Sequence, residues 1–329
     1  MINWGVFAFI GKDNGKNVNK KNLKYALVVA AHNEQSVIGQ MVDSLAQLDY
    51  DKESYDIFVV ADNCTDNTAA IAREHGAIVH ERFNNVEKGK GHALNWMFEK
   101  IFAMEKNYDA LCVFDADNII DPDFLKHINK KFNQGFKAVQ GYIDTKNPND
   151  SWITASNAMT FWCVNKVYQT ARSYLGLSNQ ICGTGFGVLC DVIKEYGWNA
   201  TCLVEDMEFT MQLNLNNIAV GWAPEAIVYD EKPLTLAQSC KQRTRWMQGH
   251  ADVASRYFVP LVKKAIKEKS LIPFDCAIYL SQPYYMIAGF LVLIISALHV
   301  IFPQIESWFL VSLSLPPVFW NILIVAQFL

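Results

Sequence analysis

Mainly apolar runs alternate with amphipathic segments through the first third of the chain. The runs lie at 25–31, 55–62, 77–81 and 109–117, and a segment with helical spacing of apolar positions follows each of the first three. Strands that are apolar on both faces are typical of parallel sheets covered by helices on both sides. The pattern therefore predicts an α/β fold with a mostly parallel sheet, in which functional residues collect at the carboxyl ends of the strands.

The second half of the chain is less regular but still predicts distinct elements. A helical segment is expected from Trp152 to Tyr174, followed by a Gly-rich strand, QICGTGFGVLC. A helix is expected to begin near Glu205, and IAVGWAPEAIVY is expected to form two short strands. A further helix is expected in TLAQSCKQRTRWMQG, just before the chain becomes more apolar.

The last part of the chain is strongly apolar. Residues 283–302 carry no formal charge, and at 1.5 Å per residue such a helix crosses about 30 Å, the thickness of a bilayer core. A second uncharged run extends from Trp308 to Leu329. Two transmembrane helices are therefore expected, and a buried helical hairpin is the alternative. Because the sequence stops inside the second run, we expect either a shortened set of spans or further spans downstream.

Four parts of the chain are expected from these features. A basic interfacial segment covers 1–24, and a cytosolic catalytic domain covers 25–250. An amphipathic interfacial helix with a connector covers 251–282, because VASRYFVPLVKKAIKEK places apolar residues on one face and lysines on the other. The transmembrane helices cover 283–329.

Charge and cysteine content narrow the location and the partners. Lysines cluster just before the first apolar run and again near the N-terminus, so the positive-inside rule predicts a multi-pass protein of the bacterial plasma membrane with a cytoplasmic catalytic domain. The chain has 8 cysteines, and the absence of a CxxC pair indicates reduced thiols rather than disulfides or a zinc site. A net charge of −4 gives no reason to expect nucleic acid as a partner.

Acidic and amide side chains follow three of the predicted strands. Asn33 and Glu34 follow the first, Asp62 ends the second, and Asp115 and Asp117 end the fourth. Neighbouring strand ends would bring these groups together, and mutually repelling carboxylates are costly unless a cation lies among them. Oxygen ligands favour Mg²⁺ or Mn²⁺, held together with phosphates. Acids that only cap helices are the alternative for each motif taken alone.

Three further motifs carry candidate chemistry. Glu205 and Asp206 are either a charge pair favoured by the dipole of the helix that they begin, or a general base near a bound diphosphate. The glycines of CGTG at 182–185 permit close approach of a bulky ligand, although a strand bulge also uses glycine. Lys88 and Lys90 begin another predicted helix, whose N-terminus favours anions.

The stretch QRTRW at 242–246 combines three side chains on one predicted helix face. Gln242, Arg245 and Trp246 have the spacing i, i+3 and i+4. A guanidinium suits phosphate oxygens, and an indole plane suits a ring. The face therefore fits a single ligand, and the alternative is a surface arginine beside a tryptophan anchored at the bilayer interface.

The order of these motifs resembles that of the family 2 glycosyltransferases. HNE, VVAD, KGHALN, FDADN, GTG, ED and QRTRW follow one another and precede apolar helices. The arrangement is more narrowly similar to the membrane-embedded processive synthases of cellulose, hyaluronan, chitin oligosaccharides and mixed-linkage glucan. The resemblance covers about residues 25–302 and implies a GT-A fold, which is Rossmann-like. This chain departs from those synthases in having no N-terminal span and a short C-terminal set, which puts a complete polymer channel in doubt.

Donor-binding roles are implied by the resemblance. Asp62 would hold the uracil of a UDP-sugar, with Asn33 and Glu34 nearby on the nucleotide. Asp115 and Asp117 match the DxD pair around the diphosphate and a divalent metal, Mg²⁺ or Mn²⁺. The other positions expected to bind the donor are Lys90, Gln242, Arg245 and Trp246.

Acceptor and catalytic roles are implied in the same way. Asp206 matches the base of the ED motif, with Glu205 beside it, and would take the proton from the incoming hydroxyl. A single displacement inverts the anomeric carbon, so an α-linked donor gives a β-linked product. The positions that match the acceptor site are Gly183, Thr184, Gly185 and Trp246.

The expected function is that of a hexosyltransferase. It would move a hexose from a UDP-sugar, with UDP-glucose favoured, to the non-reducing end of a growing β-glycan, coupled to export across the lipid bilayer. A glycosyltransferase that adds one sugar to a membrane lipid is the alternative. A non-catalytic scaffold is a third possibility, opposed by the intact acids and by Arg245. The sugar, the linkage and the chain length are not fixed by the sequence.

Overall fold

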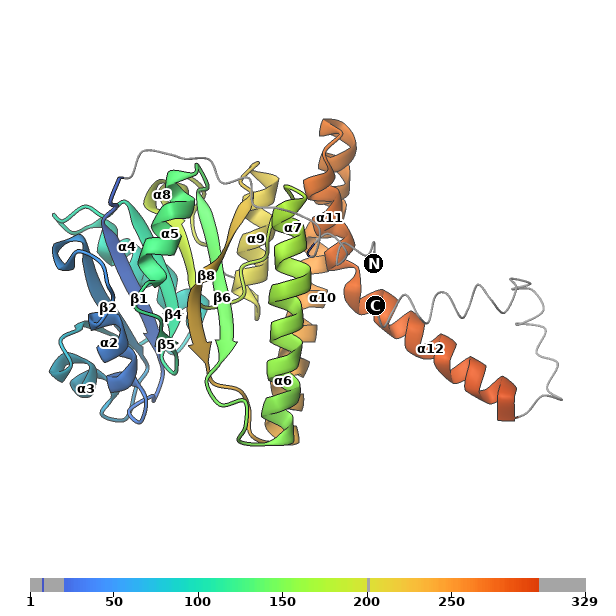
Figure 1. Ribbon diagram of the computed structural model, residues 1–329, viewed down its shortest axis with the longest axis horizontal. Helices are drawn as coiled ribbons and strands as arrows, with labels where there is room; N and C mark the ends of the chain where they lie inside the picture. The colour runs from blue at the N-terminus through green and yellow to red at the C-terminus, as the bar shows by residue number, and fades with distance from the viewer. Residues whose placement is uncertain (1–7, 9–20, 200–201, 302–329) are drawn as a thin grey trace.

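A mixed sheet of eight strands organises the part of the chain that the structure describes, namely residue 8, residues 21–199 and residues 202–301. The strands of this computed structural model are β1 (Tyr25–Ala31), β2 (Tyr55–Asp62), β3 (Ile78–Arg82), β4 (Ala110–Asp115), β5 (Ile119–Ile120), β6 (Ala138–Thr145), β7 (Phe186–Leu189) and β8 (Val220–Asp230). Their order is β3-β2-β1-β4-β7-β6-β8-β5 (Figure 1). The first four run parallel, β7 is antiparallel to both neighbours, and β6 and β8 are parallel. The predicted α/β class is confirmed.

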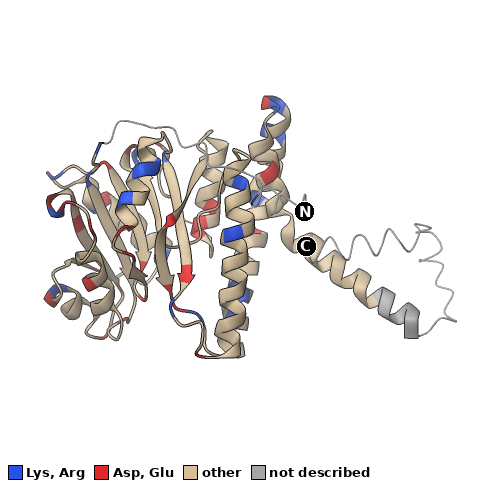
Figure 2. Ribbon diagram, viewed as in Figure 1, with Lys and Arg blue, Asp and Glu red and all other residues tan. Residues whose placement is uncertain are grey.

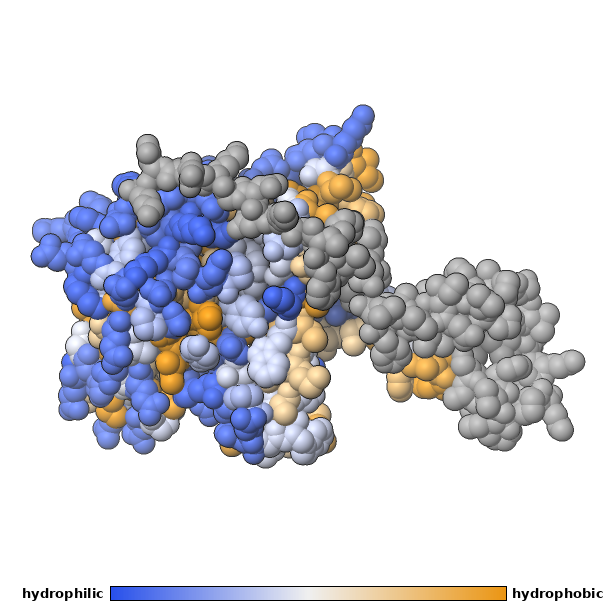
Figure 3. All heavy atoms as spheres, viewed as in Figure 1, coloured by the Kyte–Doolittle hydropathy of each residue, from blue (hydrophilic) through white to orange (hydrophobic). Residues whose placement is uncertain are grey.

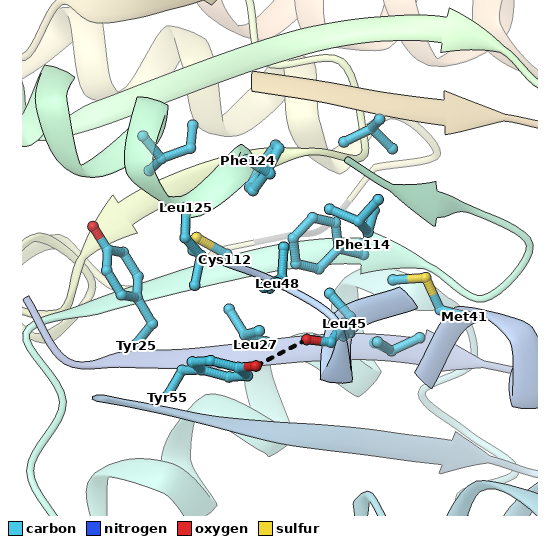
Figure 4. Packing of buried hydrophobic residues seen from close by; sticks show 14 of the residues in the cluster. Tyr25, Leu27, Met41, Leu45, Leu48, Tyr55, Cys112, Phe114, Phe124 and Leu125 are labelled. Atoms are coloured by element: carbon cyan, nitrogen blue, oxygen red, sulfur yellow. Dashed lines mark hydrogen bonds between the residues drawn. The ribbon is translucent and has the colours of Figure 1, made fainter. Parts of the chain in front are cut away.

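Helices cover both faces of the sheet, which explains why its central strands are apolar throughout. Tyr25 and Leu27 of β1 pack in one core cluster, whereas Ala26 and Val28, which point the opposite way, pack in a second cluster. Figure 4 shows the first cluster, where the Tyr55 hydroxyl donates to the Leu45 carbonyl over 3.2 Å. The helices of the first half are α2 (Ile38–Ala46), α3 (Thr68–Glu74), α4 (Lys90–Phe102) and α5 (Phe124–Asn133).

The predicted strand pair in IAVGWAPEAIVY is wrong, because the segment forms the single strand β8. Its pairing with β6 shifts register between Gly141 and Tyr142, whose partners are Ala223 and Ile227. Pro224 lies in the skipped stretch and has no N–H to donate. The irregularity interrupts the ladder without ending the strand, so the segment forms one strand with a bulge in place of two strands.

The predicted helix 152–174 is present but contains a change of winding. It consists of α6 (Trp152–Cys163), a π-helical turn, η3 (Val164–Gln169), and α7 (Thr170–Tyr174). The Gly-rich strand expected over residues 180–190 is shorter, because only Phe186–Leu189 pairs as β7. The helix near Glu205 is confirmed as α9 (Glu205–Leu215), and α8 (Cys190–Tyr196) precedes it.

The two helices expected on either side of residue 250 form one long helix, α10 (Leu236–Glu268). It begins at a capping box, in which the Thr235 hydroxyl accepts from the Gln238 N–H over 3.3 Å. Pro260 lies within the helix, which continues to Lys269, a residue with a left-handed φ of 50°. The helix therefore runs across the boundary expected between the catalytic domain and the interfacial segment.

The apolar C-terminal region begins with two helices joined at a bend. These are α11 (Leu271–Leu280) and α12 (Gln282–Ile301), and α12 extends away from the sheet (Figure 1). Among the described residues no single helix has the length and apolarity of a membrane span, so the first predicted span is not supported. Taken together, the helices 271–280 and 282–294 have the length and apolarity of a span, but the chain bends by 50° between them.

Other expectations about the ends of the chain fall outside the described residues. The second predicted span, from Trp308 to Leu329, lies there, as does nearly all of the basic segment 1–24. The 8 cysteines, all within the described part, are free thiols.

Candidate active site

The carboxyl ends of β1, β2 and β4 lie side by side at one edge of the sheet. Ala31 pairs with Ala61, the residue before Asp62, and Ala30 pairs with Asp115. Because Asn33 and Glu34 directly follow β1, the side chains predicted from three separate sequence motifs meet at this edge.

The turn after β1 is bonded to the loop after β2. Asn33 has a left-handed φ of 58°, and its side-chain oxygen accepts from the Thr65 N–H over 2.8 Å. The Glu34 N–H donates to the Thr68 hydroxyl over 2.8 Å, which leaves the Glu34 carboxylate at the strand edge. Burial and the Asp115 carboxylate raise the pKa of Glu34.

Asp62 is buried and paired with an arginine that the sequence did not single out. The Arg82 guanidinium donates to the Asp62 carboxylate over 2.7 Å and to the Glu87 carbonyl over 2.9 Å. Both side chains of the ion pair are less than one tenth exposed. Arg82 ends β3, the neighbour of β2. A basic residue at this strand end, in the stretch HER at 80–82, is the sequence signal that could have indicated the pair. This ion pair fixes the position of the Asp62 carboxylate.

Lys90 links the Asp115 strand end to the glycine loop. It is the first residue of α4, and its ammonium lies 2.5 Å from the Asp115 carboxylate and 2.7 Å from the Gly183 carbonyl. Burial alone would lower the pKa of Lys90, but the carboxylates of Asp115 and Glu205 outweigh it and raise this pKa. The side chains of Lys90 and Asp115 are 22% and 37% exposed, so both remain accessible to a ligand.

Asp117 lies near a second partly buried carboxylate, that of Asp230, which sequence reasoning missed. The Asn118 amide donates to Asp117 over 3.1 Å and to Asp230 over 2.9 Å, and the Lys232 ammonium donates to Asp230 over 2.6 Å. Burial, followed by repulsion from Asp230 and Asp115, raises the pKa of Asp117 to about 7. Asp230 ends β8, far along the chain, and no local motif indicated this contact.

The strand-end carboxylates fit a divalent cation that is shared with a phosphate. Asp115 and Asp117 repel each other in a partly buried site, and a bound cation would remove this repulsion. Within the described residues no three acidic, histidine or cysteine side chains are grouped as a metal site. Mg²⁺ commonly takes only one or two carboxylates and completes its shell with phosphates and water. Asp115 and Asp117 therefore suffice for a cation that arrives with a nucleotide diphosphate.

Asp206 stands at the start of α9, across the glycine loop from Lys90. A Cβ placed on Gly183 would lie 3.4 Å from the Asp206 carboxylate, so loop and acid are in close contact. Burial, then repulsion by Glu205, raises the pKa of Asp206 to about 7. A carboxylate that gains and loses its proton near neutral pH has the property required of a general base.

The glycine loop requires its glycines. Gly185 has a φ of 63°, and a Cβ there would lie 2.6 Å from the Val228 side chain. Between the glycines, the Thr184 hydroxyl accepts from the Asp115 N–H over 3.1 Å and donates to the Asn118 side chain. The loop is therefore bonded to the DxD segment on one side and lies against Asp206 on the other.

The QRTRW face of α10 approaches the start of α9. Trp246 is partly buried and packs in the cluster that contains Val204, the residue before Glu205. A Cβ on Gly249 would lie 2.7 Å from Val204, which shows how closely the helices approach. The structure thus brings Trp246 to the ED end of the site.

The other two positions of that face are more open. Gln242 is half-buried and Arg245 is exposed. Within the described chain the structure gives no ion pair between Arg245 and the acids of the DxD segment. Arg243, which the sequence did not single out, donates to the Asn157 side chain over 2.9 Å and so ties α10 to α6.

Comparison with known proteins identifies the family. The family model described as "Glycosyltransferase like family 2" matches residues 22–249. The chain belongs to glycosyltransferase family 2. The family resemblance predicted from the motif order is confirmed at this level, and so is the GT-A fold.

Three relatives of this family 2 chain come from bacteria. A probable glycosyltransferase, YdaM of Bacillus subtilis, is 30% identical over 77% of this chain and 61% of its own length. A beta-monoglucosyldiacylglycerol synthase of Synechocystis is 29% identical over 68% of this chain and 47% of its own length. A poly-beta-1,6-N-acetyl-D-glucosamine synthase of Staphylococcus epidermidis is 25% identical over 83% of this chain and 65% of its own length. The chain thus spans about half to two thirds of these relatives.

A solved structure supports the fold. The mannosyltransferase PcManGT of Pyrobaculum calidifontis, in complex with GDP-Man and Mn²⁺, superposes with a TM-score of 0.67. The match covers 94% of this chain and 83% of the mannosyltransferase, at 14% identity. The shared architecture is the GT-A arrangement described above.

Proposed function

We propose that this chain transfers a hexose from a UDP-sugar, with UDP-glucose favoured, to the non-reducing end of a growing β-glycan at a membrane. The chain of contacts from Asp115 through Lys90 and Gly183 to Asp206 carries the proposal. It joins two acids suited to a metal diphosphate with a titratable acid suited to deprotonate an acceptor. Such a pairing is what a single inverting displacement requires.

The donor would occupy the edge formed by β1, β2 and β4. Asp62, held by Arg82, would bind the uracil, with Asn33 and Glu34 on the nucleotide. Asp115 and Asp117 would hold Mg²⁺ or Mn²⁺, and the cation would neutralise charge on the departing UDP. Lys90 supplies a second positive charge beside Asp115. The remaining donor contacts would come from Gln242, Arg245 and Trp246.

The acceptor would lie over the glycine loop. Gly183, Thr184 and Gly185 leave its surface free of bulky side chains, and Trp246 offers an indole plane for a sugar ring. Asp206 would take the proton from the attacking hydroxyl, and burial together with Glu205 keeps the pKa of Asp206 raised. Attack on the face opposite the leaving UDP inverts the anomeric carbon.

A membrane surface is proposed at the far end of α10. Figure 3 shows apolar residues near α11 and on α12, and Figure 2 shows basic residues at the end of α10. Lysines next to an exposed apolar face suit the boundary between acidic head groups and acyl chains. We therefore propose that this surface attaches the catalytic unit to the cytoplasmic face of the plasma membrane. The exposed apolar residues there are Phe258, Val259, Ile266, Leu271 and Phe274.

The relatives favour two kinds of acceptor. The named polymer synthase matches over 83% of this chain, whereas the named glycolipid synthase matches over 68%. The polymer synthase thus aligns with more of this chain, which is the reason for preferring a glycan acceptor. The glycolipid relative makes single transfer to a membrane lipid the second candidate.

A product assay tests the proposal and separates the two candidates. Protein in nanodiscs is incubated with labelled UDP-glucose, or with UDP-N-acetylglucosamine, and Mg²⁺ or Mn²⁺. We expect a product that stays at the chromatographic origin and is degraded by one linkage-specific glycanase. A label that moves into organic solvent would instead identify a glycolipid. Chelation of the metal and the Asp117→Asn variant should each suppress transfer, and no UDP release from any donor would refute both candidates.

The pH dependence of the rate should report the candidate base. Because the pKa of Asp206 is raised to about 7, its ionised fraction grows as the pH rises through 7. We expect kcat/KM to increase up to about pH 8 and then level off. Asp117 also has a pKa of about 7, so the profile is measured at saturating metal, which keeps that carboxylate ionised. In Asp206→Asn the residual rate should no longer increase with pH in this range. An unchanged increase would exclude Asp206 as the group that causes it.

A further inference from the structure

The helix that precedes the glycine loop changes its winding at one turn. Residues Val164–Gln169 are π-helical between α6 and α7. The Thr170 hydroxyl donates to the carbonyl of Asn165, five residues earlier, over 3.0 Å. Single π-helical turns within α-helices are frequent at functional sites, because the extra residue redirects side chains. Here both ends of the turn direct a buried amide side chain into the protein.

The two amides have different targets. Asn165 is 4% exposed and donates to the Ile143 carbonyl in β6 over 2.8 Å, so it fastens the helix to the sheet. Gln169 is 1% exposed and contacts the segment that leads into the glycine loop. Its amide nitrogen donates to the Gln180 carbonyl over 3.0 Å, and its oxygen accepts from the Gln180 N–H over 3.2 Å. The same nitrogen lies 3.7 Å from the Cys182 sulfur.

Side chains, rather than a strand ladder, hold the segment 180–184. The Cys182 N–H donates to the Gln140 side chain over 2.9 Å, and that side chain donates to the Thr184 carbonyl over 2.9 Å. The Ile181 N–H donates over 3.1 Å to the hydroxyl of Thr210, which lies on the same helix as Asp206. Strand pairing of this segment with its neighbours begins only at Phe186. Each of these contacts therefore sets the conformation of the loop locally.

We propose that Gln169, directed inward by the π-helical turn, is a positioning residue for the acceptor half of the reaction. It fixes residues 180–182, and through them Gly183, against Asp206. The inference rests on the proposed function, in which the glycine loop receives the acceptor. The hydrogen bonds described above join Gln169 to Gln180 and Cys182, neither of which is proposed to bind the donor. Its loss should therefore impair transfer to the acceptor more than donor binding.

The test compares Gln169→Leu with the matched control Asn165→Leu. Both changes remove one buried amide of the same helical turn, but only the first releases the glycine loop. Partition is measured as sugar transferred to acceptor against sugar released to water, with UDP affinity measured separately. Misplacement of reacting groups by about 1 Å costs on the order of 10²-fold in rate. We expect the partition ratio in Gln169→Leu to fall about 10- to 100-fold, with UDP affinity within about twofold of the parent.

A thiol measurement tests the same inference without catalysis. Loosening of the loop should raise the alkylation rate of Cys182 about tenfold in Gln169→Leu. The rate is measured by peptide mass spectrometry. Asn165→Leu should leave that rate unchanged, and the exposed Cys163 serves as the internal reference. If Gln169→Leu fails to fold, Gln169→Glu replaces it, because the carboxylate keeps an acceptor for Gln180 and loses the donor.

The outcomes separate this inference from the proposed function. Equal partition ratios and equal Cys182 alkylation in the two leucine variants would overturn the positioning role. Faster alkylation of Cys182 in a protein that releases no UDP from any donor would support the loop contact and refute the proposed reaction. A parallel loss of UDP affinity in Gln169→Leu would show a general structural defect and would also overturn the inference.

Discussion

Replacement of Asp206 by asparagine should lower the rate of sugar transfer by about 10²- to 10⁴-fold, the usual contribution of a general base. Asparagine keeps the size of the side chain and its place against Gly183 but cannot accept the proton of the attacking hydroxyl. Because the donor edge is formed by other strands, we expect UDP affinity to remain within about threefold of the parent. The measurement is kcat for transfer together with UDP affinity by calorimetry.

The same variant should be at least as stable as the parent at pH 8. The pKa of Asp206 is raised from 3.8 to about 7, first by burial and then by Glu205. The folded state therefore binds the proton more tightly than the unfolded state, and the free energy of unfolding decreases as the pH rises from about 4 through 7. Asparagine removes this penalty, so its unfolding midpoint relative to the parent should rise between pH 5 and pH 8.

Glu205→Gln provides the matched control for the base. It removes the neighbouring charge that raises the pKa of Asp206, so the rising limb of the rate should move to lower pH while transfer persists. A rate for Asp206→Asn within threefold of the parent would exclude Asp206 as the base. A large loss of both activity and stability would instead indicate a structural role for its ionised form.

The strands of the first half were predictable because both of their faces are buried. β1 and β2 have the bounds of their apolar runs, since helices cover each side and the central positions of both strands are apolar. The glycine loop was expected to be a strand because its flanking residues are apolar. Positive φ angles at Gly183 and Gly185 prevent this, and the side chain of Gln140 replaces the missing ladder.

The site was predictable where its residues follow a strand or begin a helix. Asp62, Asp115 and Asp206 could be recognised from local sequence, because strand ends of a parallel sheet meet. The side chains that hold these acids in place could not be recognised in this way. The Asn118 amide and the Asp230 carboxylate that it contacts are 112 residues apart, and that contact depends on β8 joining the sheet. Long-range pairing of this kind leaves no periodic signal in one sequence.

Replacement of Asp275 by alanine should destabilise the folded chain by about 3–5 kcal/mol, because it leaves a buried guanidinium without its charged partner. Arg172 of α7 and Asp275 of α11 form an ion pair, and their side chains are 1% and 9% exposed. Arg172 also donates to the Ser178 carbonyl over 2.8 Å and to the Tyr168 hydroxyl over 2.6 Å. The measurement is urea unfolding in detergent, read as the change in the free energy of unfolding.

A double variant separates charge from packing. Arg172→Leu with Asp275→Leu removes both charges, so most of the stability lost in Asp275→Ala should return. If Asp275→Ala costs less than about 0.5 kcal/mol, this ion pair does not hold α11 to the catalytic unit. The expected loss of about 3–5 kcal/mol in the free energy of unfolding would place α11 in the same domain as the sheet. A chain cut at residue 250 would expose Arg172 and the apolar cluster around Val204, so α11 and the second half of α10 belong to the folding unit that holds Asp206.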